Sequence, residues 1–170
     1  MQYETDRLLL KPCNLEDAPF VLKLMNTPKW IRYIGDRNVH TIHDAENYIK
    51  EKMLSQYVRL GYGNNTVIRK ADGVKMGSCG LYDREGIEGV DIGFAFLPEY
   101  EGKGYANEAA QKVMSLAINE WSITLIKAIT TKDNVASQKL IEKLGLRYQG
   151  LTRLPNDAEE LMLYVLDSSE

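Results

Sequence analysis

A glycine-rich turn between an apolar stretch and an amphipathic stretch constrains the fold of this chain more than any other feature. The apolar stretch runs from Ile92 to Leu97, and the turn has the sequence Glu-Gly-Lys-Gly-Tyr-Ala at residues 101–106. From residue 106 onward, apolar side chains recur at helical spacing with polar side chains between them. The sequence therefore predicts a strand, a tight turn and the start of a helix.

Such a turn can bind an anion. The first N–H groups of a helix have no partner inside the helix, and the helix dipole adds partial positive charge there. Gly102 and Gly104 would let a phosphate approach the backbone. Two nucleotide-binding patterns fit poorly, because the dinucleotide fingerprint needs a third glycine where Asn107 stands and the P-loop needs Gly-Lys-Ser/Thr. An ordinary turn without a ligand is the alternative.

The length and composition limit the class of protein. The 170 residues suit a single domain, residues 1–170, with a sizeable core. The hydrophobic fraction of 44% and the charged fraction of 26% are typical of a globular chain. A net charge of -3 gives no support for a nucleic acid or an anionic membrane as partner. We find no apolar run that could span a bilayer and no signal-peptide pattern at the acidic N-terminus.

The cysteines and histidines point away from redox and metal chemistry. Cys13 and Cys79 lie far apart, so we expect small core residues in a reducing, cytoplasmic setting. Two cysteines and two histidines form no credible metal cluster, and we expect no bound metal.

Capping residues, periodicity and turn residues predict a definite order of elements. The order is strand, helix, helix, three strands, helix, strand, helix and two strands, which indicates an α+β or mixed α/β domain. Residues 29–35 are predicted to be irregular, and Ile42 is expected to face inward on the second helix. The predicted strands are 7–12, 64–69, 75–82, one ending at 97, 125–131, 146–151 and 161–166, and the predicted helices are 15–25, 42–57 or 59, 106–121 and 134–144.

A second motif makes a family resemblance specific. Residues 134–146, Asn-Val-Ala-Ser-Gln-Lys-Leu-Ile-Glu-Lys-Leu-Gly-Leu, are similar to the GNAT N-acetyltransferase signature Asn-x-x-Ser/Ala-x-x-Leu/Ile-x-x-x-x-Gly-Phe, with Leu146 in place of Phe. The glycine turn resembles the pyrophosphate loop of the same family, with Glu101 where the family has Gln or Arg. Residues 4–12 and 91–94 resemble the Rim-type branch, the ribosomal-protein-alanine N-acetyltransferases. The resemblance covers nearly the whole chain.

The resemblance implies the fold and the place of the co-substrate. The fold would be a GNAT fold with a central, mostly antiparallel sheet, splayed between its fourth and fifth strands, and helices on both faces. Acetyl-CoA would lie in the splay, with its diphosphate on the N–H groups of residues 102–106 and its pantetheine arm paired with the strand before them. The residues expected to bind it are Phe94, Phe96, Leu97, Gly102, Lys103, Gly104, Tyr105, Ala106, Asn134 and Lys143.

The resemblance also implies direct attack of an amine on the thioester. The chain lacks a Ser-His-Asp or Cys-His set, which agrees with a reaction without a covalent enzyme intermediate. A backbone N–H near Phe96 or Leu97 would stabilise the oxyanion. Asp91 is the expected base, with Glu88 in reserve, and an exposed strand acid is the alternative interpretation of Asp91.

The acid for the departing thiolate is the weakest part of the resemblance. Many relatives carry a tyrosine seven residues after the motif asparagine, where this chain has Ile141. Ser137 is the expected substitute, although a serine at the start of a helix is also an ordinary capping-region residue. Trp30 and Tyr33 are expected to border the acceptor site.

We therefore expect an acetyl-CoA-dependent N-acetyltransferase of the Rim-type branch. Its acceptor would be a protein N-terminus or a small primary amine. An amino acid, a polyamine or an aminoglycoside as acceptor stays open, as does a non-catalytic acyl-CoA-binding sensor. The sequence also leaves the oligomeric state open, a homodimer included.

Overall fold

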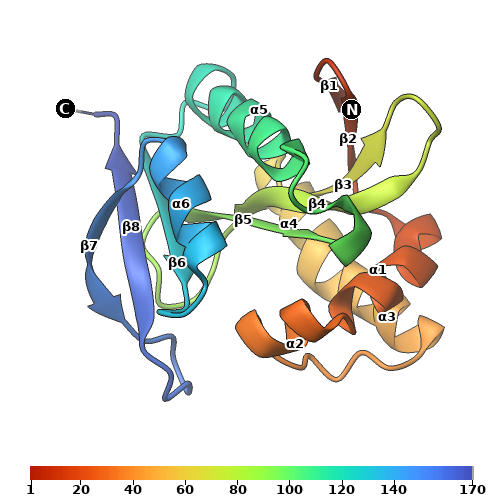
Figure 1. Cartoon of the computed structure of the whole chain (residues 1–170), viewed down its shortest axis with the longest axis horizontal. Helices are drawn as coiled ribbons and strands as arrows, with labels where there is room; N and C mark the ends of the chain where they lie inside the picture. Colours follow the sequence, from red (N-terminus) through yellow and green to blue (C-terminus); the bar gives the residue numbers. More distant parts are fainter. Residues whose placement is uncertain (170) are drawn as a thin grey trace.

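The computed structural model describes residues 1–169 as a mixed sheet with helices on both sides (Figure 1). This architecture confirms the expected α+β class. The strands are β1 (Tyr3–Glu4), β2 (Leu8–Pro12), β3 (Asn64–Arg69), β4 (Lys75–Tyr82), β5 (Val90–Phe96), β6 (Leu125–Thr130), β7 (Arg147–Thr152) and β8 (Leu161–Asp167). The helices are α1 (Ala18–Met25), α2 (Pro28–Tyr33), α3 (Ile42–Tyr48), α4 (Ser55–Leu60), α5 (Tyr105–Asn119) and α6 (Val135–Lys143).

The sheet is antiparallel except at one pair of strands. Its order is β1-β2-β3-β4-β5-β6-β8-β7, and β5 and β6 are the parallel neighbours. They pair only near their first residues, Val90 opposite Ile126 and Asp91 opposite Lys127. Beyond these two pairs the strands separate, whereas β4 and β5 stay paired over six positions. The predicted splay is therefore confirmed. It lies between β5 and β6, which correspond to the fourth and fifth predicted strands.

Helix α5 covers one face of the sheet and fixes the glycine turn at the end of β5. Ala109, Ala110, Val113 and Ala117 are fully buried against the sheet core. Because three of these side chains are alanines, the helix lies close to the strands. Its first turn is thus held over the edge of the splay (Figure 1).

Helices α1 to α4 lie on the other side of the sheet (Figure 1). Their apolar side chains form a second cluster, which includes Val21 on α1 and Ala45 on α3. Asp17 ties the start of α1 to the sheet, because its buried carboxylate lies 2.6 Å from the Lys75 ammonium and accepts a 3.0 Å hydrogen bond from the Thr66 hydroxyl. A π-helical turn, Ile49–Leu54, joins α3 to α4, so the predicted second helix is continuous to Leu60.

Two local predictions are wrong for identifiable reasons. Residues 29–35 are not irregular, because the Thr27 hydroxyl accepts from the Trp30 N–H and Pro28 stands at the first helical position, which together start α2. Ile42 is 43% exposed, because the inward face of α3 begins later, at Ala45. The two-residue strand β1 was not predicted.

The two cysteines are core residues, as expected. Cys13 is 2% and Cys79 0% exposed, and burial raises the pKa of each thiol to about 12. Among residues 1–169, the structure contains no helix long and apolar enough to cross a membrane.

Candidate active site

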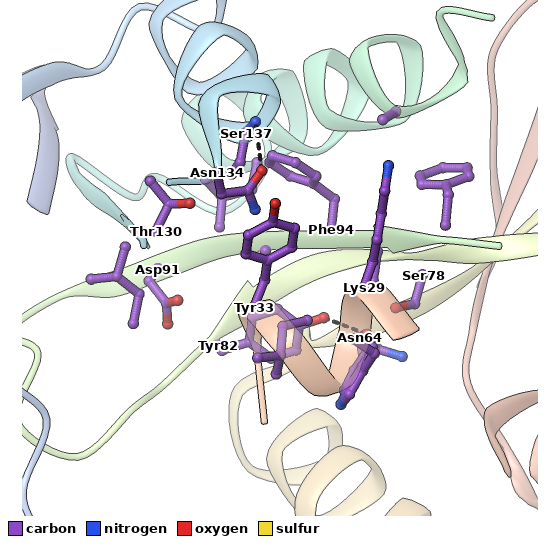
Figure 2. Close-up of a pocket in the computed structure, with 18 of the residues that line it drawn as sticks. Lys29, Tyr33, Asn64, Ser78, Tyr82, Asp91, Phe94, Thr130, Asn134 and Ser137 are labelled. Carbon is purple, nitrogen blue, oxygen red and sulfur yellow. Dashed lines mark hydrogen bonds between the residues drawn. The ribbon is translucent and has the colours of Figure 1, made fainter. Parts of the chain in front are cut away.

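A cleft of about 1270 Å³ opens where β5 and β6 part (Figure 2). It brings together residues that are distant in the sequence, from α2, β5, the glycine turn and α6. The predicted site residues that line it are Trp30, Tyr33, Asp91, Phe94, Phe96, Gly102, Gly104, Tyr105, Ala106, Asn134 and Ser137. Leu97, Lys103 and Lys143 do not line it, and both lysines are exposed.

The glycine turn presents unpaired backbone donors at the cleft. Gly102 has φ +74° and Gly104 has φ +82°, a left-handed conformation that favours glycine. Gly104 is the N-cap of α5 and has no side chain to accept from the first helical amides. Within residues 1–169, the N–H groups of residues 102–106 donate to no protein group. These unpaired donors and the α5 dipole give the turn the features of the predicted anion site.

Arg7 supports this turn from the N-terminal strands. Its guanidinium donates to the Lys103 carbonyl at 3.1 Å and to the Glu108 carboxylate at 2.7 Å, and it lies 4.3 Å from the centroid of the Tyr105 ring. Partial burial raises the pKa of Glu108, but hydrogen bonds from Thr5 and Arg7 outweigh it and hold the pKa below its usual range. Residues 4–12 carried only a family resemblance in the sequence, and this contact was not predicted.

Strand β5 directs alternate amides into the splay. The Leu97 N–H donates to the Met76 carbonyl at 2.9 Å, so this group is already paired with the preceding strand. Because hydrogen bonds alternate between the two sides of an antiparallel strand, the N–H groups of Phe94 and Phe96 point away from β4, toward the gap. Two oxyanion donors were predicted. The Leu97 N–H is not available for this role, whereas the Phe96 N–H has the suitable orientation.

Asp91 is a buried carboxylate in the cleft. Its exposed fraction is 2%, so its interpretation as an exposed strand acid is wrong. Burial raises the pKa of Asp91, and the Arg84 guanidinium, 3.2 Å away, lowers it only in part. Arg84 lies in the turn before β5 and was not predicted as a site residue from the sequence. Glu88, the reserve base, is exposed and does not line the cleft.

Asn134 and Ser137 occupy the opposite side of the splay, at the start of α6. The Asn134 side-chain oxygen accepts from the Ser137 N–H at 3.3 Å and so caps the helix. In the described part of the chain, the Asn134 amide nitrogen and the Ser137 hydroxyl make no hydrogen bond with protein groups. Ile141, which replaces the family tyrosine, is 1% exposed.

Helix α2 connects the two sides of the cleft. Lys29 forms an ion pair with Glu101, next to the glycine turn, and Arg32 pairs with Asp133 at 2.9 Å, next to Asn134. The unusual Glu101 thus has a cationic partner. An acid in place of the family's Gln or Arg was the available signal for such a partner, but the sequence alone did not identify Lys29.

Three carboxylates form an acidic rim at the end of the cleft opposite the glycine turn. Glu85 from the β4–β5 turn and Asp157 and Glu159 from the β7–β8 turn line it. These two turns are close, since a Cβ on Gly86 would lie 2.5 Å from Pro155. The ion pairs formed among residues 1–169 include none of these three carboxylates. The rim therefore offers negative charge to a cationic molecule.

A model of the acetyltransferase (GNAT) domain matches residues 7–147. The chain belongs to the GNAT acetyltransferase family. The family uses acetyl-CoA, and the match is to the RimJ/RimL type.

Individual relatives agree with this assignment. The uncharacterized N-acetyltransferase YnaD of Bacillus subtilis is 27% identical to this GNAT protein over 154 residues, which is 88% of this chain and 85% of YnaD. The spermidine N(1)-acetyltransferase of Escherichia coli K12 is 23% identical over 142 residues, 83% of this chain and 73% of that enzyme.

Solved structures show the same fold. A GNAT acetyltransferase from Bacillus anthracis superimposes with a TM-score of 0.80 at 26% identity, covering 100% of both chains. RimL, a ribosomal L7/L12 acetyltransferase in complex with coenzyme A, superimposes with a TM-score of 0.81 at 16% identity, again covering 100% of both chains.

Proposed function

We propose that this protein transfers the acetyl group of acetyl-CoA to a primary amine by direct attack. The observation that carries the proposal is the pairing of two features in one cleft, the unpaired amides of residues 102–106 and the buried carboxylate of Asp91. The first suits a diphosphate and the second suits a base that removes a proton from an amine.

The residues of the cleft fit coenzyme A. The free N–H groups of residues 102–106 would hold its diphosphate, and a side chain at Gly104 would strain the turn. The outward amides of Phe94 and Phe96 would pair with the pantetheine arm like an added strand. The free amide nitrogen of Asn134 would donate to the arm from the other side, and Lys103 and Lys143 would add diffuse positive charge near the phosphates.

The cleft residues also supply the three groups that the transfer needs. Asp91 takes a proton from the attacking amine, and its raised pKa makes it a stronger base than an ordinary aspartate. The Phe96 N–H donates to the oxyanion that forms during attack. The Ser137 hydroxyl donates a hydrogen bond to the departing sulfur.

We propose a small polycationic amine, of the polyamine type, as the acceptor. The unpaired carboxylates Glu85, Asp157 and Glu159 on the rim support this class, because they would attract the distal ammonium groups of such a molecule. The relative that acetylates spermidine supports it as well. Trp30 and Tyr33 would border the acceptor.

Thiol release measured with a panel of amines tests both parts of the proposal. We expect the highest kcat/KM with a polyamine, and we expect it to fall as salt screens the rim. Faster turnover with an N-terminal peptide or an amino acid would contradict the polyamine class and leave the acetyl transfer intact. Tight binding of acetyl-CoA with no turnover of any amine would contradict the enzyme and favour an acyl-CoA sensor.

A further inference from the structure

Helix α2 lies across the cleft, and both of its bridging ion pairs are on one side of the helix. Lys29 and Arg32 are three residues apart, which places them on the same side. Lys29 contacts Glu101 on the β5 side of the splay, and Arg32 contacts Asp133 on the α6 side. The helix is thus fixed at both ends above the place where the strands part.

Tyr33, the last residue of α2, extends from this helix into the cleft. In Figure 2 its hydroxyl points toward Asn134 and the first turn of α6, where Ser137 lies. The Arg32 guanidinium, 5.0 Å from the ring centroid, packs against the ring and limits its movement. The Tyr33 hydroxyl forms no hydrogen bond to another group of residues 1–169, so it is free to contact a bound molecule.

The start of α6 lacks a good proton donor of its own. Ile141 has no hydroxyl, and Ser137 carries an aliphatic alcohol, a far weaker acid than a phenol. Of the two tyrosines labelled in Figure 2, Tyr82 donates its hydroxyl to the Asn64 side chain, whereas Tyr33 directs its hydroxyl toward the start of α6, where a thiolate leaving between β5 and α6 would lie. From the sequence, Tyr33 was predicted only to border the acceptor site.

We propose that Tyr33 is a catalytic residue that protonates the departing thiolate of coenzyme A, an inference that rests on the proposed acetyl transfer. As the amine nitrogen bonds to the acetyl carbon and the carbon–sulfur bond breaks, the sulfur takes the phenolic proton. Asp91 accepts the proton lost by the amine, and solvent returns it to the Tyr33 oxygen. Ser137 keeps its hydrogen bond to the sulfur.

The charged groups around this end of the cleft define how the rate depends on pH. Arg32 and Asp133 lie beside Tyr33, Lys29 lies on the same helix, and Asp91 and Arg84 lie on the β5 side. Of these groups, Asp91 must be ionised and Tyr33 must be protonated for turnover. The fall in kcat at low pH would report Asp91.

The test compares Tyr33→Phe with Ser137→Ala and with Tyr148→Phe. Tyr148 is a matched control, because it is a half-exposed tyrosine on β7 outside the cleft. We expect Tyr33→Phe to lower kcat by about 100-fold or more. We expect a smaller loss of kcat for Ser137→Ala, and the wild-type kcat for Tyr148→Phe.

A second measurement needs no turnover. The absorbance of the coenzyme A thiolate, titrated in complex with each protein, gives the pKa of the bound thiol. Loss of the Tyr33 hydrogen bond should raise that pKa in Tyr33→Phe relative to the wild type. An active wild type, with kcat and the thiol pKa both unchanged in Tyr33→Phe, would overturn the role of Tyr33 alone. A wild type that does not bind coenzyme A would overturn the proposed function and this role with it.

Discussion

Asp91 and Arg84 form a pair of opposite charges, and Arg84 influences the pKa of Asp91, the proposed base. Burial raises the pKa of Asp91, so the carboxylate takes up a proton at a higher pH than an ordinary aspartate. The activity that depends on the ionised form is therefore lost as pH falls, beginning above the usual carboxyl range of about 4. Arg84 opposes this shift with its positive charge.

We predict that Arg84→Gln moves the low-pH fall of kcat/KM to higher pH by about one unit or more. The lost guanidinium no longer favours the ionised carboxylate, so the pKa of Asp91 rises further. A pH profile of kcat/KM checks this. Arg59→Gln is the control, because Arg59 pairs with the neighbouring Asp83 at 2.9 Å and not with Asp91. An unmoved fall in Arg84→Gln would show that Asp91 is not the base.

Gly104 is the second residue on which the account depends. We predict that Gly104→Ala weakens coenzyme A binding about fivefold, since an alanine at φ +82° is strained by roughly 1 kcal/mol and its relief would turn the amides away from the ligand. Calorimetry with coenzyme A measures the change. Gly73→Ala carries the same kind of strain in the β3–β4 hairpin, at φ +73°. Gly73→Ala should lower the free energy of unfolding as much as Gly104→Ala does and leave coenzyme A binding unchanged. Equal affinities of the two variants for coenzyme A would refute the role of the glycine turn.

The residue-scale predictions from sequence succeeded where the chemistry is local to the backbone. The Gly102 and Gly104 turn needs left-handed residues before a helix, and both glycines and the following apolar pattern are visible in the sequence. Side-chain contacts that depend on the three-dimensional arrangement were not predictable. Arg84 with Asp91 and Lys29 with Glu101 depend on how the strands and α2 are placed in space.

At the scale of elements, α2 holds the two sides of the splay by exposed ion pairs. Such pairs contribute little to stability, typically below about 1 kcal/mol, but they fix the direction in which the helix and Tyr33 point. Their importance should therefore appear in turnover rather than in unfolding.

We predict that Asp133→Asn lowers kcat several-fold and changes the free energy of unfolding by less than about 1 kcal/mol. The variant removes the ionic partner of Arg32, so α2 is held less firmly on the α6 side. Asp72→Asn is the matched control, because it breaks an arginine pair in the β3–β4 hairpin, outside the cleft. Steady-state kinetics and urea unfolding of both variants test this. Equal kcat values would contradict a positioning role for the α2 pair.

The elements themselves were mostly predictable, because strong apolar periodicity and clear caps mark them. The long helix α5 follows from its alanine-rich inward face, and α6 follows from Asn134 and Gly145 at its ends. Helix α2 was missed, because its six residues are too few to show a period and none of them is buried. Its start signal, Thr27 before Pro28, was present in the sequence.

At the scale of the whole molecule, the sheet consists of two parts that share only two paired positions at β5 and β6. The family resemblance predicted this splay, but the size and lining of the cleft come from side chains of four separate segments. Coenzyme A would bridge the two parts, with its diphosphate at the start of α5 and its arm between β5 and α6. Binding should therefore stabilise the folded protein in proportion to ligand concentration.

The most direct test of the account is backbone amide hydrogen exchange, measured residue by residue with and without coenzyme A. The N–H groups of residues 102–106 have no protein partner, so we expect fast exchange in the free protein. On addition of coenzyme A we expect the largest slowing at these residues, with smaller slowing at Phe94 and Phe96. Binding of coenzyme A with unchanged exchange at residues 102–106 would contradict the claim that these amides hold its diphosphate.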